Sequence, residues 1–128
     1  MIIEHAAFNV PDALGMANWL VENLGMKIVR SGPGPVWCHF LADSSGTRLI
    51  EIYTHASVHM PDYAALDARV VHLAFAVDDV PASRQRLFAA GAKSDVDFTE
   101  TPEGDQFAIV RDPWGFPVQL VRRRISML

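Results

Sequence analysis

The sequence of this chain contains one segment twice. Residues 5–12 read HAAFNVPD and residues 72–79 read HLAFAVDD, so His, Ala, Phe, Val and Asp recur in register 67 positions apart. A glycine follows at a matching distance in each half, since Gly25 lies 20 residues after the first histidine and Gly91 lies 19 residues after the second. Such a repeat indicates two copies of one supersecondary unit. We therefore expect two modules of similar fold.

Each module is expected to have the element order βαβββ. In the first module, alternating apolar residues predict a strand over residues 2–10, and the helix that follows has Asp12 as its N-cap and Gly25 as its left-handed C-cap. The further predictions are strands at 27–30, 36–42 and 48–53 in the first module and, in the second, a strand at 70–77, a helix at 80–90 and strands at 92–96, 106–110 and 117–122.

The length and composition are those of a single domain of the α+β class. With 128 residues, 50% of them apolar, the chain can bury a sizeable core, whereas a module of half this length would be marginal alone. We assign residues 1–128 to one domain, with the first module at about 1–54, a linker at about 55–69 and the second module at about 70–124.

Charge and cysteine content exclude several classes of partner. The formal net charge is −4, whereas nucleic acids and anionic membranes are bound by clustered Lys and Arg. The single cysteine, Cys38, permits no disulfide within the chain, the first residues lack the features of a secretory signal, and no apolar run reaches the roughly 18 residues of a membrane span. We expect a cytoplasmic protein that acts on a small molecule and binds neither nucleic acid nor membrane.

The repeat also places four potential metal ligands at equivalent positions. Glu51 follows His5 by 46 residues, and Gln119 follows His72 by 47 residues. Imidazole, carboxylate and amide oxygen are all groups that bind divalent metals in proteins. Two modules related by a two-fold repeat would bring such a doubled pair together at one site.

Strand alternation sets the direction of Glu51. In the segment RLIEIY, the β-branched Ile50 and Ile52 take the face that packs under a helix, so Glu51 projects from the other face. A carboxylate among apolar residues requires a partner, which is either an arginine or, together with two imidazoles, a divalent ion. The same alternation turns Gln119 toward the open face of its own sheet.

The last predicted strand carries the most specific motif. Residues 112–120 read DPWGFPVQL, which resembles the D-P-x-G-x-x-x-E-L ending of the vicinal oxygen chelate superfamily, and the two His-bearing first strands and the strand with Glu51 resemble it as well. This superfamily holds glyoxalase I, methylmalonyl-CoA epimerase, extradiol dioxygenases, fosfomycin resistance enzymes and bleomycin resistance proteins. The resemblance covers the whole chain. It implies a cup-shaped, barrel-like mixed sheet of two βαβββ modules with helices outside, and pairing of chains into a homodimer.

The resemblance further implies a metal site made by His5, Glu51, His72 and Gln119. Two imidazoles and one carboxylate suit Zn, Ni, Mn or Fe(II). Gln119 stands where the superfamily has Glu, so the site contains one carboxylate and keeps a formal charge of about +1. Such a charge favours an anionic substrate with two neighbouring oxygens.

Glu51 and Gln119 are the candidate catalytic residues. The resemblance implies that the final Glu of glyoxalase I acts as the general base, which an amide cannot do, so strict glyoxalase I chemistry is disfavoured. The proton would then be taken by Glu51, by a metal-bound hydroxide or, ranked lowest, by His39. We expect a glyoxalase-like lyase or isomerase that chelates the vicinal oxygens of an anionic substrate.

Two other functions remain open. One is an Fe(II) ring-cleaving dioxygenase, for which the same two histidines and Glu51 would form the ligand set. The other is a metal-free drug or metabolite binder of bleomycin-resistance type, in which an acidic cup is lined by aromatic residues. Trp37, Tyr53 and Trp114 are expected near that cup or its rim.

Overall fold

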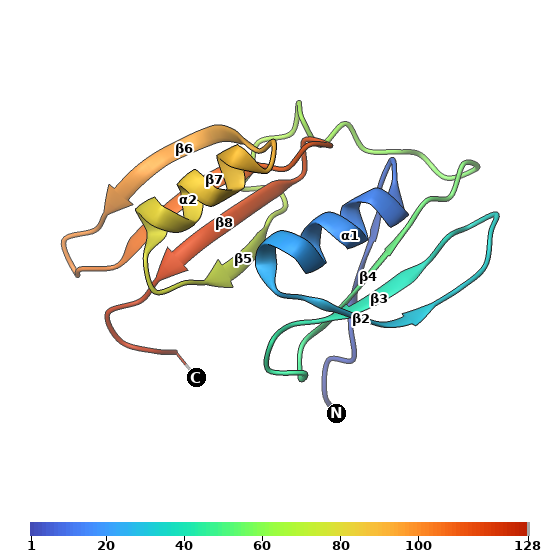
Figure 1. The fold of residues 1–128 in the computed structure, drawn as a ribbon, viewed down its shortest axis with the longest axis horizontal. Helices are drawn as coiled ribbons and strands as arrows, with labels where there is room; N and C mark the ends of the chain where they lie inside the picture. The colour runs from blue at the N-terminus through green and yellow to red at the C-terminus, as the bar shows by residue number, and fades with distance from the viewer. Residues whose placement is uncertain (128) are drawn as a thin grey trace. The chain divides into compact units, whose positions relative to one another are not determined.

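The computed structural model describes residues 1–127, and the chain forms two compact units (Figure 1). The first unit spans Met1–Pro61 and the second begins at Asp62, so the boundary falls inside the segment predicted as a linker. Each unit has the order βαβββ, which confirms the α+β class and the repeat of one module.

The first unit is a four-stranded mixed sheet with one helix. Its elements are β1 (Ala6–Asn9), α1 (Ala13–Leu24), β2 (Lys27–Ser31), β3 (His39–Ala42) and β4 (Leu49–Tyr53). The strand order is β1-β4-β3-β2, with β1 parallel to β4 and the other neighbours antiparallel. The helix packs on β3 and β4.

Both ends of α1 are fixed by local chemistry. The Asp12 carboxylate accepts a hydrogen bond from the backbone N–H of Gly15, and Gly25 adopts a φ of 69°, which glycine reaches without strain. Between these caps, apolar residues at helical spacing form one buried stripe. The buried residues are Ala13, Met16, Ala17, Trp19 and Leu20 on α1, and Leu41, Ile50 and Ile52 on the facing strands.

The second unit repeats this arrangement. Its elements are β5 (Leu73–Ala76), α2 (Val80–Ala89), β6 (Lys93–Glu100), β7 (Gln106–Arg111) and β8 (Pro117–Arg122). The strand order is β5-β8-β7-β6, with β5 parallel to β8. On α2, Ser83 occupies a buried position between Val80 and Leu87, where helical spacing favours an apolar residue, and its hydroxyl accepts a hydrogen bond of 3.2 Å from the guanidinium of Arg86.

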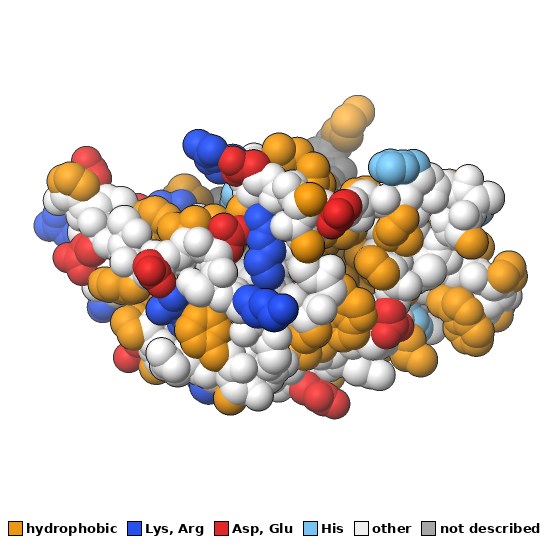
Figure 2. All heavy atoms as spheres, turned by 90° about the horizontal axis from the view of Figure 1, so that it is seen from above, with side chains coloured by type: hydrophobic (Ala, Val, Ile, Leu, Met, Phe, Trp, Pro, Cys, Tyr) orange, Lys and Arg blue, Asp and Glu red, His pale blue; other side chains and the backbone are white. Residues whose placement is uncertain are grey.

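Each sheet ends in two edge strands, since β1, β2, β5 and β6 pair with one neighbour each in the described part of the chain. Strand β2 is exposed along its whole length. Unpaired edges favour association between chains, so they support the homodimer, which stays a prediction. On the face drawn in Figure 2, basic and acidic side chains are interspersed with apolar ones. Among residues 1–127, no helix has the length and apolar character of a membrane span.

Three strands start three or four residues later than alternation predicts. Strand β1 starts at Ala6 and not at residue 2, because its partner β4 begins at Leu49 and a longer β1 would run past it. Strand β5 likewise starts at Leu73 and not at residue 70. Strand β3 starts at His39 and not at residue 36, since Trp37 has a φ of 44°, outside the strand region. Strand β6, in contrast, is longer than predicted.

The segment just after the unit boundary packs on the second unit. The guanidinium of Arg111 donates hydrogen bonds to the carbonyl of Tyr63 and, at 2.7 Å, to that of Leu66. The same guanidinium lies 2.6 Å from the carboxylate of Asp95. The rings of Tyr63 and Phe116 are in contact, with centroids 4.7 Å apart. The second half of the predicted linker is therefore part of the second unit.

Gly115 is the tightest point of this packing and gives a stability prediction. Its φ is 85°, and a Cβ there would lie 2.7 Å from the Cβ of Ala64 and 3.0 Å from the Ala64 backbone. We expect Gly115→Ala to lower the free energy of unfolding by about 3 kcal/mol, because a clash adds to backbone strain. The control is Gly46→Ala, since Gly46 has a φ of 72° with open space around it. Its expected cost is about 1 kcal/mol, and equal losses in urea denaturation would contradict the prediction.

Candidate functional site

Glu51 lies on the face of the first sheet that is opposite α1. Its neighbours Ile50 and Ile52 are buried, whereas the side chain of Glu51 keeps 21% of its surface exposed. The strand ladders place Ala7 and Phe40 beside Glu51 on the same face. This is the orientation that strand alternation predicts.

The imidazole of His5 lies between two carboxylates. Its Nε2 is 3.4 Å from Oε2 of Glu51, and its Nδ1 contacts the carboxylate of Glu4. The ring also stands edge-on to Phe40, with centroids 5.3 Å apart and planes at 88°. The hydrogen bond that the His5 ring donates to the Glu4 carboxylate raises the pKa of His5 above its ordinary value. Desolvation opposes this shift, and the charge of Glu51 adds to it.

In the second unit, Gln119 lies on the equivalent face of its sheet. Gln119 on β8 stands opposite Ala74 on β5 and Ile109 on β7, while the flanking Val118 and Leu120 are buried on the other side. The second histidine lies just before β5, two residues ahead of Ala74 and outside the ladder with β8. The first unit thus brings a histidine and a carboxylate together, whereas in the second unit Gln119 lies on the face opposite α2 and His72 precedes β5.

The two histidines share one feature of hydrogen bonding. Nδ1 of His72 is 2.8 Å from the carbonyl oxygen of Ala68, and Nδ1 of His5 contacts the carboxylate of Glu4. Both partners can only accept, so Nδ1 is the donor in each ring. In the neutral ring the lone pair is then on Nε2, which is the atom that a metal requires.

Of the four predicted ligands, His5 and Glu51 are in contact in the first unit, and His72 and Gln119 belong to the second unit. Within residues 1–127, no cluster of three or more His, Cys, Asp or Glu side chains is arranged to hold a metal ion. The set of His5, Glu51, His72 and Gln119 stays a prediction, which requires the two pairs to meet.

The placement of His39 corrects its ranking as a possible base. His39 stands opposite Ile52 in the ladder, so it belongs to the helix side of the sheet and not to the face of Glu51. It is 5% exposed, its Nδ1 is 2.9 Å from the hydroxyl of Ser31, and burial lowers its pKa. The sequence could not show this, because apolar residues on both sides of His39 conceal the alternation.

Asn9 lies on the same face as Glu51 and has a role that sequence reasoning missed. It is buried, and its Oδ1 accepts a hydrogen bond of 2.9 Å from the backbone N–H of His55. Its Nδ2 lies 3.5 Å from the carbonyl oxygens of His55 and His59. Asn9 therefore fastens the segment after β4 to the first unit. The sequence signal for this role is an Asn near the end of a predicted strand.

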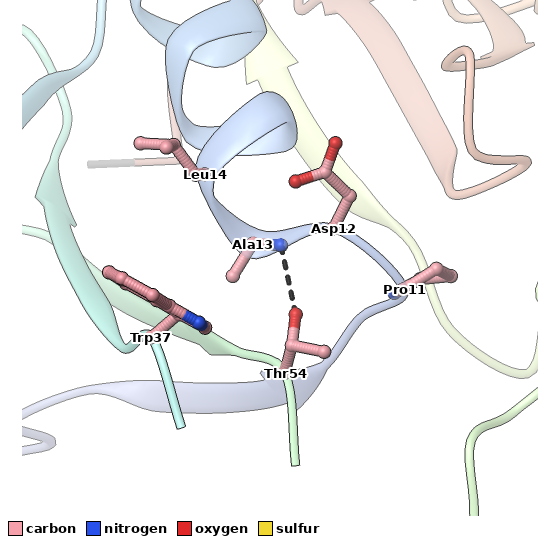
Figure 3. Close-up of a pocket in the computed structure, with 6 residues that line it drawn as sticks. All are labelled: Pro11, Asp12, Ala13, Leu14, Trp37 and Thr54. Atoms are coloured by element: carbon pink, nitrogen blue, oxygen red, sulfur yellow. Dashed lines mark hydrogen bonds between the residues drawn. The ribbon is translucent and has the colours of Figure 1, made fainter. Parts of the chain in front are cut away.

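A hollow of about 290 Å³ lies at the start of α1, on the helix side of the first unit (Figure 3). The indole of Trp37 forms one wall beside Leu14, and Trp37 is 53% exposed. The Thr54 hydroxyl accepts a hydrogen bond of 3.0 Å from the backbone N–H of Ala13 and donates one of 2.8 Å to the carbonyl of Val10. Trp37 thus lines this hollow at the start of α1, and its expected place near the cup or its rim stays a prediction.

A comparison with models of protein families gives a match that spans both units. The model of the Glyoxalase/Bleomycin resistance protein/Dioxygenase superfamily matches residues 2–120. The chain belongs to this superfamily. Among curated protein sequences none matches the chain.

Several solved structures share the fold of this chain. The structure of SMU.1112c is similar with 27% identity and a TM-score of 0.73, covering 95% of this chain and 98% of that one. A glyoxalase I mutant from Zea mays is similar with 24% identity and a TM-score of 0.74, covering 96% of this chain and 46% of that one. TnmS3, an antibiotic binding protein from Streptomyces sp. CB03234, has 19% identity and a TM-score of 0.70, with 95% of each chain covered.

The superfamily motif at residues 112–120 begins with a buried carboxylate. Oδ1 of Asp112 accepts hydrogen bonds from the backbone N–H groups of Trp114, at 2.9 Å, and Phe116, at 2.8 Å. Asp112 is 3% exposed, and its Oδ2 has no hydrogen-bond partner among residues 1–127. Burial raises the pKa of Asp112 to about 6, although the backbone hydrogen bonds favour the carboxylate.

This shift predicts a pH dependence of stability. From about pH 4 to about pH 6 the unfolded chain loses the Asp112 proton before the folded chain does, so stability that is present at low pH is lost as the pH rises. Asp112→Asn should remove this effect. Its free energy of unfolding, taken relative to the original protein, should rise by roughly 2 kcal/mol between about pH 4 and pH 7. Urea denaturation at both pH values tests this, and parallel pH profiles of the two proteins would refute it.

Proposed function

We propose that this protein is a metal-dependent enzyme of the glyoxalase type, a lyase or isomerase that binds the vicinal oxygens of an anionic small molecule. The observation that supports this proposal most is the hydrogen bonding of the two histidines. Nδ1 of His5 and Nδ1 of His72 each face an acceptor, so both rings offer Nε2 as a ligand. This is the second-sphere arrangement that metal-binding histidines have in general.

The donor set fits a divalent transition metal. Two imidazoles and the carboxylate of Glu51 suit Zn, Ni, Mn or Fe(II), and the amide oxygen of Gln119 is a weaker neutral ligand or a partner for bound water. The 3.4 Å between Nε2 of His5 and Oε2 of Glu51 is consistent with two ligands of one site. The site requires the pairs of both units, contributed by one chain or by two.

The charge of this set supports an anionic substrate. A divalent ion with Glu51 as the one carboxylate ligand keeps a formal charge of about +1. When bound, the metal supplies Lewis acidity to the substrate oxygens. Among the proposed ligands Glu51 is the group that can take a proton, through Oε2, whereas the amide of Gln119 orients the substrate or water by hydrogen bonding.

A metal-free binder of drugs or metabolites is the second candidate. The hollow beside Trp37 and Leu14 supports it, because an exposed indole beside an apolar cavity suits a planar ligand. The structural likeness to the antibiotic binding protein concerns the fold alone. No observation in residues 1–127 favours the Fe(II) dioxygenase over these two functions.

Metal binding is the first test of the proposal. Protein purified without affinity-tag nickel should bind about one divalent ion per site, as measured by elemental analysis and by titration calorimetry with Zn(II), Ni(II), Mn(II) and Fe(II). His5→Ala and His72→Ala should each weaken binding by more than about 100-fold. His59→Ala is the matched control, since His59 is exposed in the segment after β4. No bound metal and no stabilisation by any of the four ions would exclude the enzyme and favour the binder.

Gln119 gives a second test, because it is the departure from the superfamily motif. Gln119→Glu adds a charged ligand of nearly the same shape, so metal affinity should rise by about 10-fold or more while the formal charge of the site falls from about +1 to 0. Native turnover that depends on a cationic site should fall. Gln119→Ala should weaken metal binding only modestly. If Gln119→Glu leaves affinity unchanged and only lowers the melting temperature, Gln119 lies outside the reach of the metal.

A further inference from the structure

The two candidate histidines are held by acceptors of different charge. Nδ1 of His72 faces a neutral backbone carbonyl, that of Ala68. Nδ1 of His5 faces the carboxylate of Glu4, whose side chain is 69% exposed. A carboxylate acceptor makes an imidazole a stronger electron donor than a carbonyl does. The ring of His5 is therefore the better ligand of the two.

The contact of Glu4 with His5 depends on where β1 begins. In a regular strand, consecutive side chains point to opposite faces, which would turn Glu4 toward the helix side and away from His5. The ladder with β4 starts only at Ala6, opposite Ile50, so residues 4 and 5 are not bound by strand alternation. The late start of β1 thus permits a carboxylate to reach the outer nitrogen of His5.

Glu4 also fixes the direction of the ring. When Nδ1 is bonded to Glu4, the other ring nitrogen, Nε2, lies 3.4 Å from Oε2 of Glu51. The edge-on contact with Phe40, at 88° between planes, limits rotation about the same axis. A flipped ring would lose both contacts and direct a carbon toward Glu51.

We propose that Glu4 is a positioning residue, which directs Nε2 of His5 to the metal and supplies through the imidazole the negative charge that Gln119 does not. This inference rests on the proposed function. The formal charge of the ion and Glu51 is about +1, and Glu4 brings the site with its nearest surroundings close to neutrality. Glu4 thereby supplies the negative charge that a second carboxylate ligand would bring, without binding the metal itself.

The test compares two variants that each remove one negative charge from the first unit. Glu4→Gln should weaken Zn(II) binding by about 10-fold or more in titration calorimetry, the range known for outer-sphere partners of metal ligands. Glu22→Gln is the matched control, because Glu22 is an exposed carboxylate on α1 and should leave affinity unchanged. Glu4→Asp, which keeps the charge, should retain more affinity than Glu4→Gln.

A readout on the metal-free protein separates positioning from a purely structural role. The ¹⁵N shifts of the His5 ring, at a pH where the ring is neutral, should report a proton on Nδ1 in the original protein and a mixture of tautomers in Glu4→Gln. If Zn(II) binds and the affinities of Glu4→Gln and Glu22→Gln are equal, the inference is wrong while the proposed function stands. If the original protein binds no metal, the proposed function fails and this inference fails with it.

Discussion

The parallel ladder between the first and last strand of each unit determines which side chains can meet at the candidate site. It pairs Ala7 with Glu51 in the first unit and Ala74 with Gln119 in the second, and each histidine lies two residues before the paired alanine. A slip of one residue in either ladder would turn Glu51 or Gln119 under a helix and expose its apolar neighbours. The burial of those neighbours therefore keeps Glu51 and Gln119 in register. The contacts that stabilise the core also set the direction of these two side chains.

Strand alternation is enough to predict the direction of Glu51 and Gln119 from sequence, because large apolar residues flank both and must face a helix. It fails for His39, whose neighbours are apolar on both sides, and only the ladder with Ile52 fixes its face. It also misplaces Glu4, since a strand predicted from residue 2 assigns Glu4 and His5 to opposite faces. The start of β1 depends on where its partner strand begins, which is tertiary information.

The repeat is symmetric in backbone and asymmetric in charge. The first unit carries both carboxylates near its histidine, those of Glu51 and Glu4, whereas the second offers the amide of Gln119 and a backbone carbonyl. Duplicated modules keep the positions at which a side chain meets the site, because those follow from the ladder. The chemical character at each position is free to diverge, since neither amide nor carboxylate on the open face is needed for the core.

The segment that joins the two units is fastened at both ends, which leaves few torsions to vary. Asn9 bonds to the backbone of His55 and His59, and Arg111 bonds to the carbonyls of Tyr63 and Leu66. Between these anchors are residues 60–62, of which the middle one is a proline with φ fixed near −65° and a restricted predecessor. Each anchor joins the segment to its own unit, Asn9 on the side of the first and Arg111 on the side of the second. The backbone freedom of the segment is therefore confined to residues 60–62.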